Sequence, residues 1–165
     1  MRVEMSIAPE LIAMLPRLRR FAMTLCGSPA TADDLDQAAC EKAWANQDSW
    51  TPGTRFDAWM FRILRNKWID GLRRQKTEGH VEPIEKRGDL IGDHGEARAM
   101  DKLTLEDVRR AVNLLPPEQK EVLLLICVEE LAYGEAADVL GVPLGTVMSR
   151  LSRARKRLNE MTQAA

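Results

Sequence analysis

The chain has 165 residues, of which 30% are charged and 45% hydrophobic, a composition typical of a soluble protein with one compact domain or two small ones. Its net charge of −1 does not by itself indicate a nucleic-acid partner. The longest apolar run has seven residues, Val122 to Val128, too few to span a membrane, and no signal-peptide pattern is present, so we expect a cytoplasmic protein.

The first predicted helix follows from apolar residues at alternating spacings of four and three, which define one helix face: Leu11, Leu15, Leu18, Ala22 and Leu25. Pro16 lies inside this series, and we expect it to kink the helix or to mark a restart. Ser28 and Pro29 then form the pattern of an N-cap followed by a first-turn proline. A second helix is therefore predicted to begin there.

In the second predicted helix, the residues expected to face the core are Leu35, Ala39, Ala43 and Trp44. The loop from Gln47 to Arg55 contains Pro52-Gly53, which indicates a turn. A third helix follows, whose apolar side consists of Phe56, Trp59, Met60, Ile63, Leu64, Trp68 and Leu72. Trp44, Trp59 and Trp68 fit these apolar stripes, and we interpret them as core residues. Trp50 could stack on a base or cover the core, and the sequence leaves both readings open.

The periodicity fades from Thr77 to about Glu96, where glycines and charges are typical of a linker. The C-terminal half resumes with four predicted helices: about Asp101 to Leu115, Pro116-Pro117 to about Glu130, Tyr133 to Leu140, and Pro143 or Leu144 toward Met161. We find no strand pattern and no internal repeat. We therefore expect an all-α fold of two small helical domains, residues 1–76 and 99–165, joined by a flexible linker at 77–98.

The last two predicted helices have the pattern of a helix-turn-helix. Ala137 and Gly141 are small residues four apart, which lets two helices cross closely. Gly141 is placed for a left-handed C-cap, and Pro143 suits the beginning of the next helix. Val147 and Leu151 should pack back onto the preceding helix. The exposed face of the second helix should then carry Thr146, Ser149, Arg150, Arg153 and Arg157.

Basic residues are concentrated in two places. Residues 62–76 contain six Lys or Arg against one acid, and residues 149–158 contain five against none. The acids gather at 33–41, 78–107 and 118–138. A solvated helix face is the ordinary explanation of a charge run. The small-residue turn beside an acid-free basic face favours DNA binding, with base edges read early in the helix and phosphates bound later.

Three stretches in this order resemble the extracytoplasmic-function class of bacterial RNA polymerase sigma factors: ADDLDQAACEKAWAN, FDAWMFRILRNKWIDGLRR and LPPEQKEVLLLICVEELAYGEAADVLGVPLGTVMSRLSRARKRL. The resemblance covers about Leu11 to Leu158. It implies that the first domain, region 2, binds the β′ clamp helices of core RNA polymerase and melts the −10 promoter element. The second, region 4, reads the −35 element as duplex and contacts the β flap. The class usually has an anti-sigma factor as a further partner.

The resemblance also implies roles for individual residues. The core polymerase-binding face is Asp33, Asp34, Gln37 and Glu41. The residues that would contact the −10 element are Arg62, Arg65, Asn66, Arg73 and Arg74. Asn66 and the loop from Gln47 to Arg55 would form the pocket for a flipped base. Contacts with the −35 duplex fall to Thr146, Ser149, Arg150, Arg153 and Arg157. Solvent-exposed helix faces are the alternative reading of each set.

The chain departs from the family pattern at several positions. Met148 stands where a basic residue is common, so one usual DNA contact is absent. The family usually has LSYEEIA where this chain reads LAYGEAA, and we expect Gly134 and Ala136 to weaken that helix. Asp36 and Cys40 stand where apolar residues are common. These differences bear on the details of polymerase and DNA contact.

No catalytic or metal site is predicted. His80 and His94 lie in the linker without a second ligand, and Cys26, Cys40 and Cys127 are too far apart for a metal-ligand motif. We therefore expect neither an enzyme nor a cofactor. Two other functions are possible. A stand-alone helix-turn-helix regulator would not need the basic, aromatic third helix. A sigma-like decoy that captures an anti-sigma factor usually includes a receiver domain, for which this chain has no room.

Overall fold

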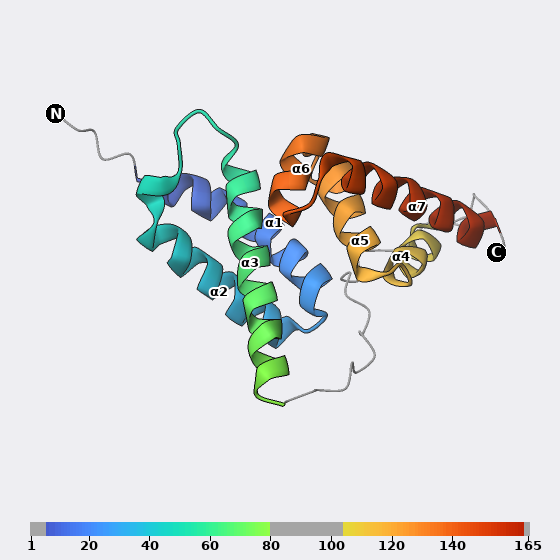
Figure 1. The fold of residues 1–165 in the computed structure, drawn as a ribbon, viewed down its shortest axis with the longest axis horizontal. Coiled ribbons are helices and arrows are strands. Elements are labelled where there is room, and N and C mark those ends of the chain that lie inside the picture. Colours follow the sequence, from blue (N-terminus) through green and yellow to red (C-terminus); the bar gives the residue numbers. More distant parts are fainter. Residues whose placement is uncertain (1–5, 80–103, 164–165) are drawn as a thin grey trace. The chain divides into compact units, whose positions relative to one another are not determined.

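The computed structural model describes residues 6–79 and 104–163 (Figure 1). Every regular element within these two ranges is helical, which confirms the predicted all-α fold. The described residues form two compact units, one built mainly from residues before the predicted linker and one mainly from residues after it. The linker residues 80–98 lie outside the described ranges.

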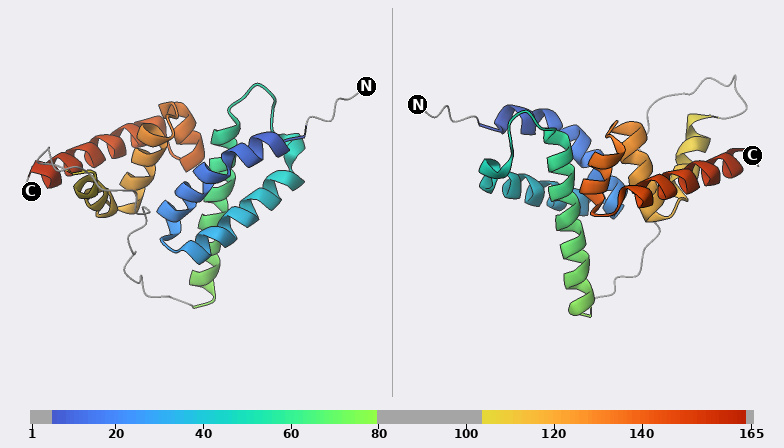
Figure 2. Two further views of the ribbon diagram at one scale, coloured as in Figure 1. Left: turned by 180° about the vertical axis from the view of Figure 1, so that it is seen from behind. Right: turned by 45° about the horizontal axis from the view of Figure 1, so that its top comes forward.

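The N-terminal unit consists of three helices that pack against one another in every pair: α1 (Ala8–Cys26), α2 (Pro29–Ala45) and α3 (Phe56–Thr77) (Figure 2). A short 3-10 turn, η1 (Gln47–Ser49), begins the loop between α2 and α3. Phe21 and Phe61 meet edge to face in the core, with ring centroids 5.0 Å apart. Around them lie the buried residues Met14, Leu18, Ala22, Leu25, Ala32, Leu35, Ala39, Ala43, Met60 and Leu64.

The junction between α1 and α2 has the predicted capping residues. Gly27 ends α1 with φ +74°, a left-handed conformation that glycine adopts without strain. The Ser28 hydroxyl accepts a hydrogen bond from the Thr31 N–H at 3.4 Å, and Pro29 occupies the first turn of α2. Pro16 lies inside α1, which continues through it as one helix, so of the two predicted outcomes the restart is wrong, while the kink stays a prediction. Packing of the residues on both sides of Pro16 into the core outweighs the hydrogen bond that proline cannot donate.

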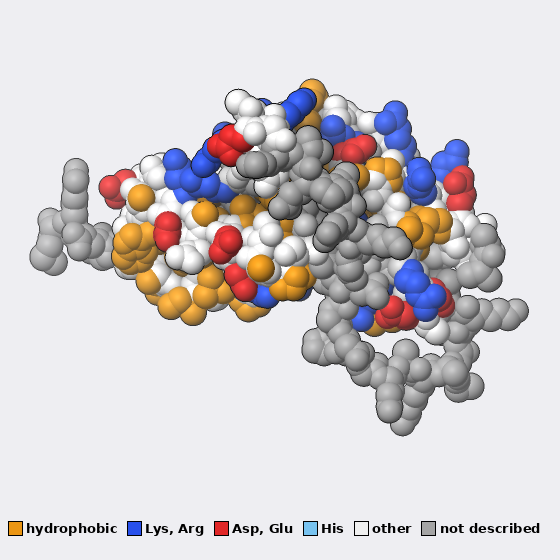
Figure 3. Space-filling model, turned by 90° about the horizontal axis from the view of Figure 1, so that it is seen from below, with side chains coloured by type: hydrophobic (Ala, Val, Ile, Leu, Met, Phe, Trp, Pro, Cys, Tyr) orange, Lys and Arg blue, Asp and Glu red, His pale blue; other side chains and the backbone are white. Residues whose placement is uncertain are grey.

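Three residues predicted for the core are exposed. Trp44 is 51%, Leu15 42% and Leu72 40% exposed. Trp44 follows the buried Ala43, and one residue turns a helix by about 100°, which carries the indole out of the core. On α1 the buried stripe runs through Met14 rather than Leu15 for the same reason. Figure 3 shows hydrophobic side chains exposed on one face of this unit.

The described chain after residue 103 contains α4 (Leu105–Asn113), α5 (Pro117–Leu123), η2 (Leu124–Val128), α6 (Tyr133–Leu140) and α7 (Leu144–Gln163), with α4 and α5 packed against α7. A capping box fixes the beginning of α4: the Thr104 hydroxyl accepts from the Asp107 N–H at 3.2 Å, and the Asp107 carboxylate accepts from the Thr104 N–H at 3.0 Å. The Thr104 hydroxyl also donates to the Asp107 carboxylate at 2.8 Å. The hydrogen bonds that this carboxylate accepts, from the Thr104 N–H first and then from the Thr104 hydroxyl, hold the pKa of Asp107 below its usual value.

The helix predicted from Pro117 to about Glu130 changes its hydrogen bonding midway. After Leu123 it continues as the π-helical turn η2, where the Glu129 N–H donates to the Leu124 carbonyl at 2.9 Å. Glu130 then has φ +56°, a left-handed conformation that is uncommon outside glycine. Leu125 and Leu131 are buried on either side of this bend, so burial of both leucines accompanies the irregular backbone.

Candidate nucleic-acid interface

The turn between α6 and α7 has the geometry that the sequence predicts. Gly141 is left-handed, with φ +65°, and its N–H donates to the Ala137 carbonyl. The Pro143 carbonyl accepts from the N–H of Thr146 at 3.0 Å, which closes the first turn of α7. Val147 and Leu151, predicted to face inward, are both buried. A short, fixed turn therefore separates the two helices of the helix-turn-helix.

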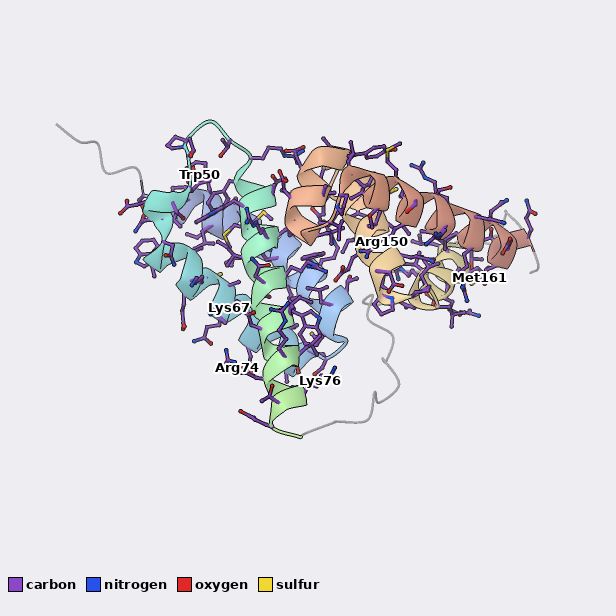
Figure 4. The ribbon with its side chains drawn as sticks, in the orientation of Figure 1. Trp50, Lys67, Arg74, Lys76, Arg150 and Met161 are labelled. Carbon is purple, nitrogen blue, oxygen red and sulfur yellow. The ribbon has the colours of Figure 1, made fainter. Side chains whose placement is uncertain are left out.

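The solvent face of α7 is basic. Ser149, Arg153 and Arg157 are exposed, whereas Thr146 and Arg150 are half-buried at its margin. Arg150 is labelled on α7 in Figure 4. This face also carries three exposed residues that are not among the site residues predicted from the sequence: Lys156 roughly opposite the buried stripe, with Ser152 and Arg155 towards one margin. The first acid along α7 is Glu160, so a polyanion would meet no negative charge before the last turns.

Helix α3 carries the second basic surface. Arg62, Asn66, Arg73 and Arg74 are exposed, and Arg65 is half-buried. Figure 4 shows Lys67, Arg74 and Lys76 along this helix. Within residues 6–79 and 104–163, Arg62, Arg73 and Arg74 form no ion pair. Their charges are therefore available to phosphate groups.

The loop before α3 is held at both ends. Trp50 packs edge to face on Phe56 with centroids 5.3 Å apart, and its indole N–H is buried without a hydrogen-bond partner in the described structure. At the other end, the Asp57 carboxylate accepts hydrogen bonds from Arg17 at 2.9 Å and from Arg55 at 2.7 Å. Burial alone would raise the pKa of Asp57, but the hydrogen bonds from Arg55, Arg17 and the Ala58 N–H bring it below its usual value.

The predicted acidic face of α2 is solvent-exposed at all four positions, Asp33, Asp34, Gln37 and Glu41. Asp33 pairs with Arg19 of α1, and the Gln37 amide donates to the Glu41 carboxylate at 3.1 Å. Asp34 has no hydrogen-bond or ion-pair partner among the described residues. The face can therefore offer carboxylates to a basic partner.

Asp36 lies beside this face and is half-buried. One carboxylate oxygen is buried and has no hydrogen-bond partner in the parts of the chain that the structure describes. Burial raises the pKa of Asp36 to about 6, and Arg19 only partly opposes this effect. Cys40, one turn later, is half-buried, and burial together with the Asp36 and Glu41 carboxylates raises the pKa of its thiol. Two polar groups thus lie half-buried one turn apart on α2.

Other kinds of site are not found in the described residues. No group of three or more histidine, cysteine or acidic residues is placed to hold a metal ion in the two described ranges. Cys26, Cys40 and Cys127 form no disulfide in the described structure. None of the helices over residues 6–79 and 104–163 is long and apolar enough to cross a bilayer.

The site has the features of a DNA-binding transcription protein. Along the chain these are an acidic helix, then a basic helix after a Pro-Gly turn, and then a basic helix-turn-helix. Family comparison extends this: the model of sigma-70 region 2 matches residues 11–78, and that of sigma-70 region 4 matches residues 105–158. The chain belongs to the sigma-70 family of RNA polymerase sigma factors, in its extracytoplasmic-function (ECF) class.

Individual relatives agree with this assignment. The ECF RNA polymerase sigma factor EcfG of Rhodopseudomonas palustris is 34% identical over 156 residues, covering 94% of this chain and 84% of that protein. The RNA polymerase sigma factor CnrH of Cupriavidus metallidurans is 31% identical over 147 residues, covering 84% and 77%. The solved structure of the sigma factor RpoE of Bartonella quintana with the anti-sigma factor NepR is 36% identical, with a TM-score of 0.73 and coverage of 95% and 96%.

Proposed function

We propose that the chain acts as an alternative sigma factor, which binds core RNA polymerase and directs it to promoters by reading a −35 duplex and melting a −10 element. The observation that carries this proposal is the presence, in one chain, of both matched regions, each with an exposed basic helix. A stand-alone helix-turn-helix regulator would account for α7 but not for α3. We assign region 2 to residues 1–76 and region 4 to residues 99–165, with a linker at 77–98.

In region 2, the acidic face of α2 binds the β′ clamp helices. Asp34 is its most available carboxylate, since Asp33 is paired with Arg19 and Glu41 accepts from Gln37. The −10 element meets α3 on the side carrying Arg62, Arg65, Asn66, Arg73 and Arg74. There the arginines follow phosphates and the Asn66 amide hydrogen-bonds a base that has left the stack.

In region 4, α7 enters the major groove of the −35 element, as the second helix of a helix-turn-helix does. Thr146, Ser149 and Arg150 lie in its first two turns and contact base edges or adjacent phosphates. Arg153 and Arg157 lie further along and bind phosphates. The duplex is therefore read near the turn and held along the rest of the helix.

An anti-sigma factor is the expected second protein partner. The Bartonella quintana relative, at 36% identity, was solved in complex with the anti-sigma factor NepR. The same partner class fits here, and its binding would compete with polymerase or DNA. The relatives are transcription regulators, and we propose that this chain likewise acts in the cytoplasm without catalysis or a cofactor of its own.

The test is promoter-specific transcription by core polymerase with and without the purified chain. A sigma factor gives defined transcripts that require the chain. A stand-alone regulator binds duplex DNA in a gel-shift assay without polymerase and does not enable core polymerase to make defined transcripts. A decoy binds the anti-sigma factor and leaves transcription by core polymerase unchanged. Arg150→Ala should then lower both affinity and sequence discrimination at the −35 element, by ~1–3 kcal/mol if the guanidinium holds a guanine.

A further inference from the structure

Two exposed apolar side chains precede the arginines of α7. Leu144 is 49% and Met148 51% exposed, and residues four apart lie on the same side of a helix. The buried stripe of α7 runs instead through Val147, Leu151 and Ala154. Core packing therefore does not account for Met148, which faces solvent in the free chain.

The outward face of α7 has two chemically different margins. At about 100° per residue, Met148, Ser152 and Arg155 follow one margin, and all three are exposed. Arg150 and Arg157 follow the other. The first margin is thus apolar in the early turns, where a recognition helix contacts base edges, and becomes cationic only in the later turns, where phosphates are bound.

Methionine at this position cannot bind a phosphate, but it suits an apolar group in the groove. Its thioether chain is unbranched, polarizable and flexible enough to fit an irregular surface. In the major groove, thymine presents a C5 methyl group beside its O4 acceptor, and apolar side chains recognise that methyl. Met148 is the fifth residue of α7 and lies next to Ser149, which we assign to base or nearby phosphate contact.

We propose that Met148 is a specificity-determining residue that reads the C5 methyl group of a thymine in the −35 duplex. This inference rests on the proposed sigma-factor function and adds a base preference to it. Removing one methyl from the contact should weaken binding about fourfold, which is the transfer free energy of one buried methylene-sized group expressed as a ratio.

The probe is a duplex promoter selected by the wild-type holoenzyme from a library randomised across the −35 region. Each −35 thymine is then replaced by deoxyuridine, which lacks only the C5 methyl. Binding by holoenzymes carrying wild-type chain, Met148→Ala or Met148→Lys is measured across salt concentrations. Val128→Ala serves as the control, because Val128 is an equally exposed apolar residue, 50% exposed, outside α7.

We expect one thymine at which deoxyuridine weakens wild-type and Val128→Ala binding about fourfold but leaves Met148→Ala unchanged. Met148→Lys should lose the methyl preference and steepen the slope of log affinity against log salt by ~0.9, as one added phosphate contact does. The proposal is overturned if no −35 thymine responds, if Met148→Ala still responds, or if Met148→Ala weakens core polymerase binding instead. Failure of the wild-type holoenzyme to select any sequence would refute the sigma-factor function itself.

Discussion

Asp36→Asn should remove a contribution to stability that decreases as the pH rises, because Asp36 keeps a buried, unpartnered carboxylate oxygen on α2. Its pKa is raised from 3.8 to about 6 in the folded chain, so the folded state favours the protonated carboxyl. The stabilisation linked to this protonation is fully present below the unfolded pKa, near 4, and is lost as the pH rises through about 6.

The size of the effect follows from the same values. Each pKa unit corresponds to ~1.4 kcal/mol, so a displacement from 3.8 to about 6 would amount to ~3 kcal/mol if Asp36 were fully buried. The side chain is only half-buried, and solvent screening reduces the expected contribution to ~1 kcal/mol. Asparagine keeps the shape of the side chain and removes the ionisation.

The assay is urea unfolding, followed by far-UV circular dichroism from pH 4 to pH 8 at constant ionic strength. The free energy of unfolding of Asp36→Asn, relative to wild type, should rise by ~1 kcal/mol from pH 4 to pH 8. Asp34→Asn removes a negative charge from an exposed position on the same helix and is the matched control. A relative stability of Asp36→Asn that stays constant with pH, or an equal rise in Asp34→Asn, would refute the reasoning.

Three further predictions concern folding, polymerase binding and promoter opening. A Cβ at Gly134 or at Gly141 meets nothing within 4 Å, but of these two glycines only Gly141 has a left-handed backbone. In urea titrations, Gly134→Ala should therefore raise the free energy of unfolding by ~0.5–1 kcal/mol, and Gly141→Ala should lower it by a similar amount. Equal effects of the two substitutions would contradict the backbone argument. Asp34→Lys should weaken a core polymerase pull-down more than Asp33→Lys, since Asp33 is already paired; circular dichroism checks that helix content is unchanged. The Asn66→Ala variant should bind core polymerase and −35 duplex normally but fail to form open complexes on duplex templates. A template pre-melted at −10 should restore its transcription. Equal loss on both templates would assign the defect to folding or polymerase binding.

Local sequence signals were sufficient for most of the fold. Ser28, Pro29, Gly141 and the Pro116-Pro117 pair define helix ends through capping and backbone geometry, which depend on a few neighbouring residues. The predicted range of α6 agrees with the structure at both ends. Helical spacing also predicted the exposed positions on α2 and three of the five on α7, Ser149, Arg153 and Arg157, whereas Thr146 and Arg150 are half-buried. The roles of these residues in polymerase and DNA binding stay predictions.

Where tertiary packing decides, the sequence was less informative. A restart at Pro16 is one of the two outcomes that the sequence predicts, but Met14 and Leu18 are buried in the core and α1 continues through Pro16. Trp44 was assigned to the core by its apolar character, although a single residue step from Ala43 turns it toward solvent. The π-helical turn after Leu123 has no local pattern of its own, because it depends on how Leu125 and Leu131 are buried on either side of it.

The pairing of Asp57 with Arg17 and Arg55 has a consequence for how promoter binding responds to salt. Both guanidinium groups lie near the loop that precedes α3, and a simple tally of positive charges would include them among the groups that displace counterions from DNA. Because both donate to the same carboxylate, its one negative charge offsets one of the two positive charges, and the two arginines together should displace at most one condensed cation when DNA binds. The salt dependence of the −10 contact should therefore reflect mainly the exposed arginines of α3, Arg62, Arg73 and Arg74, at roughly 0.7 in slope for each single-strand phosphate that they neutralise.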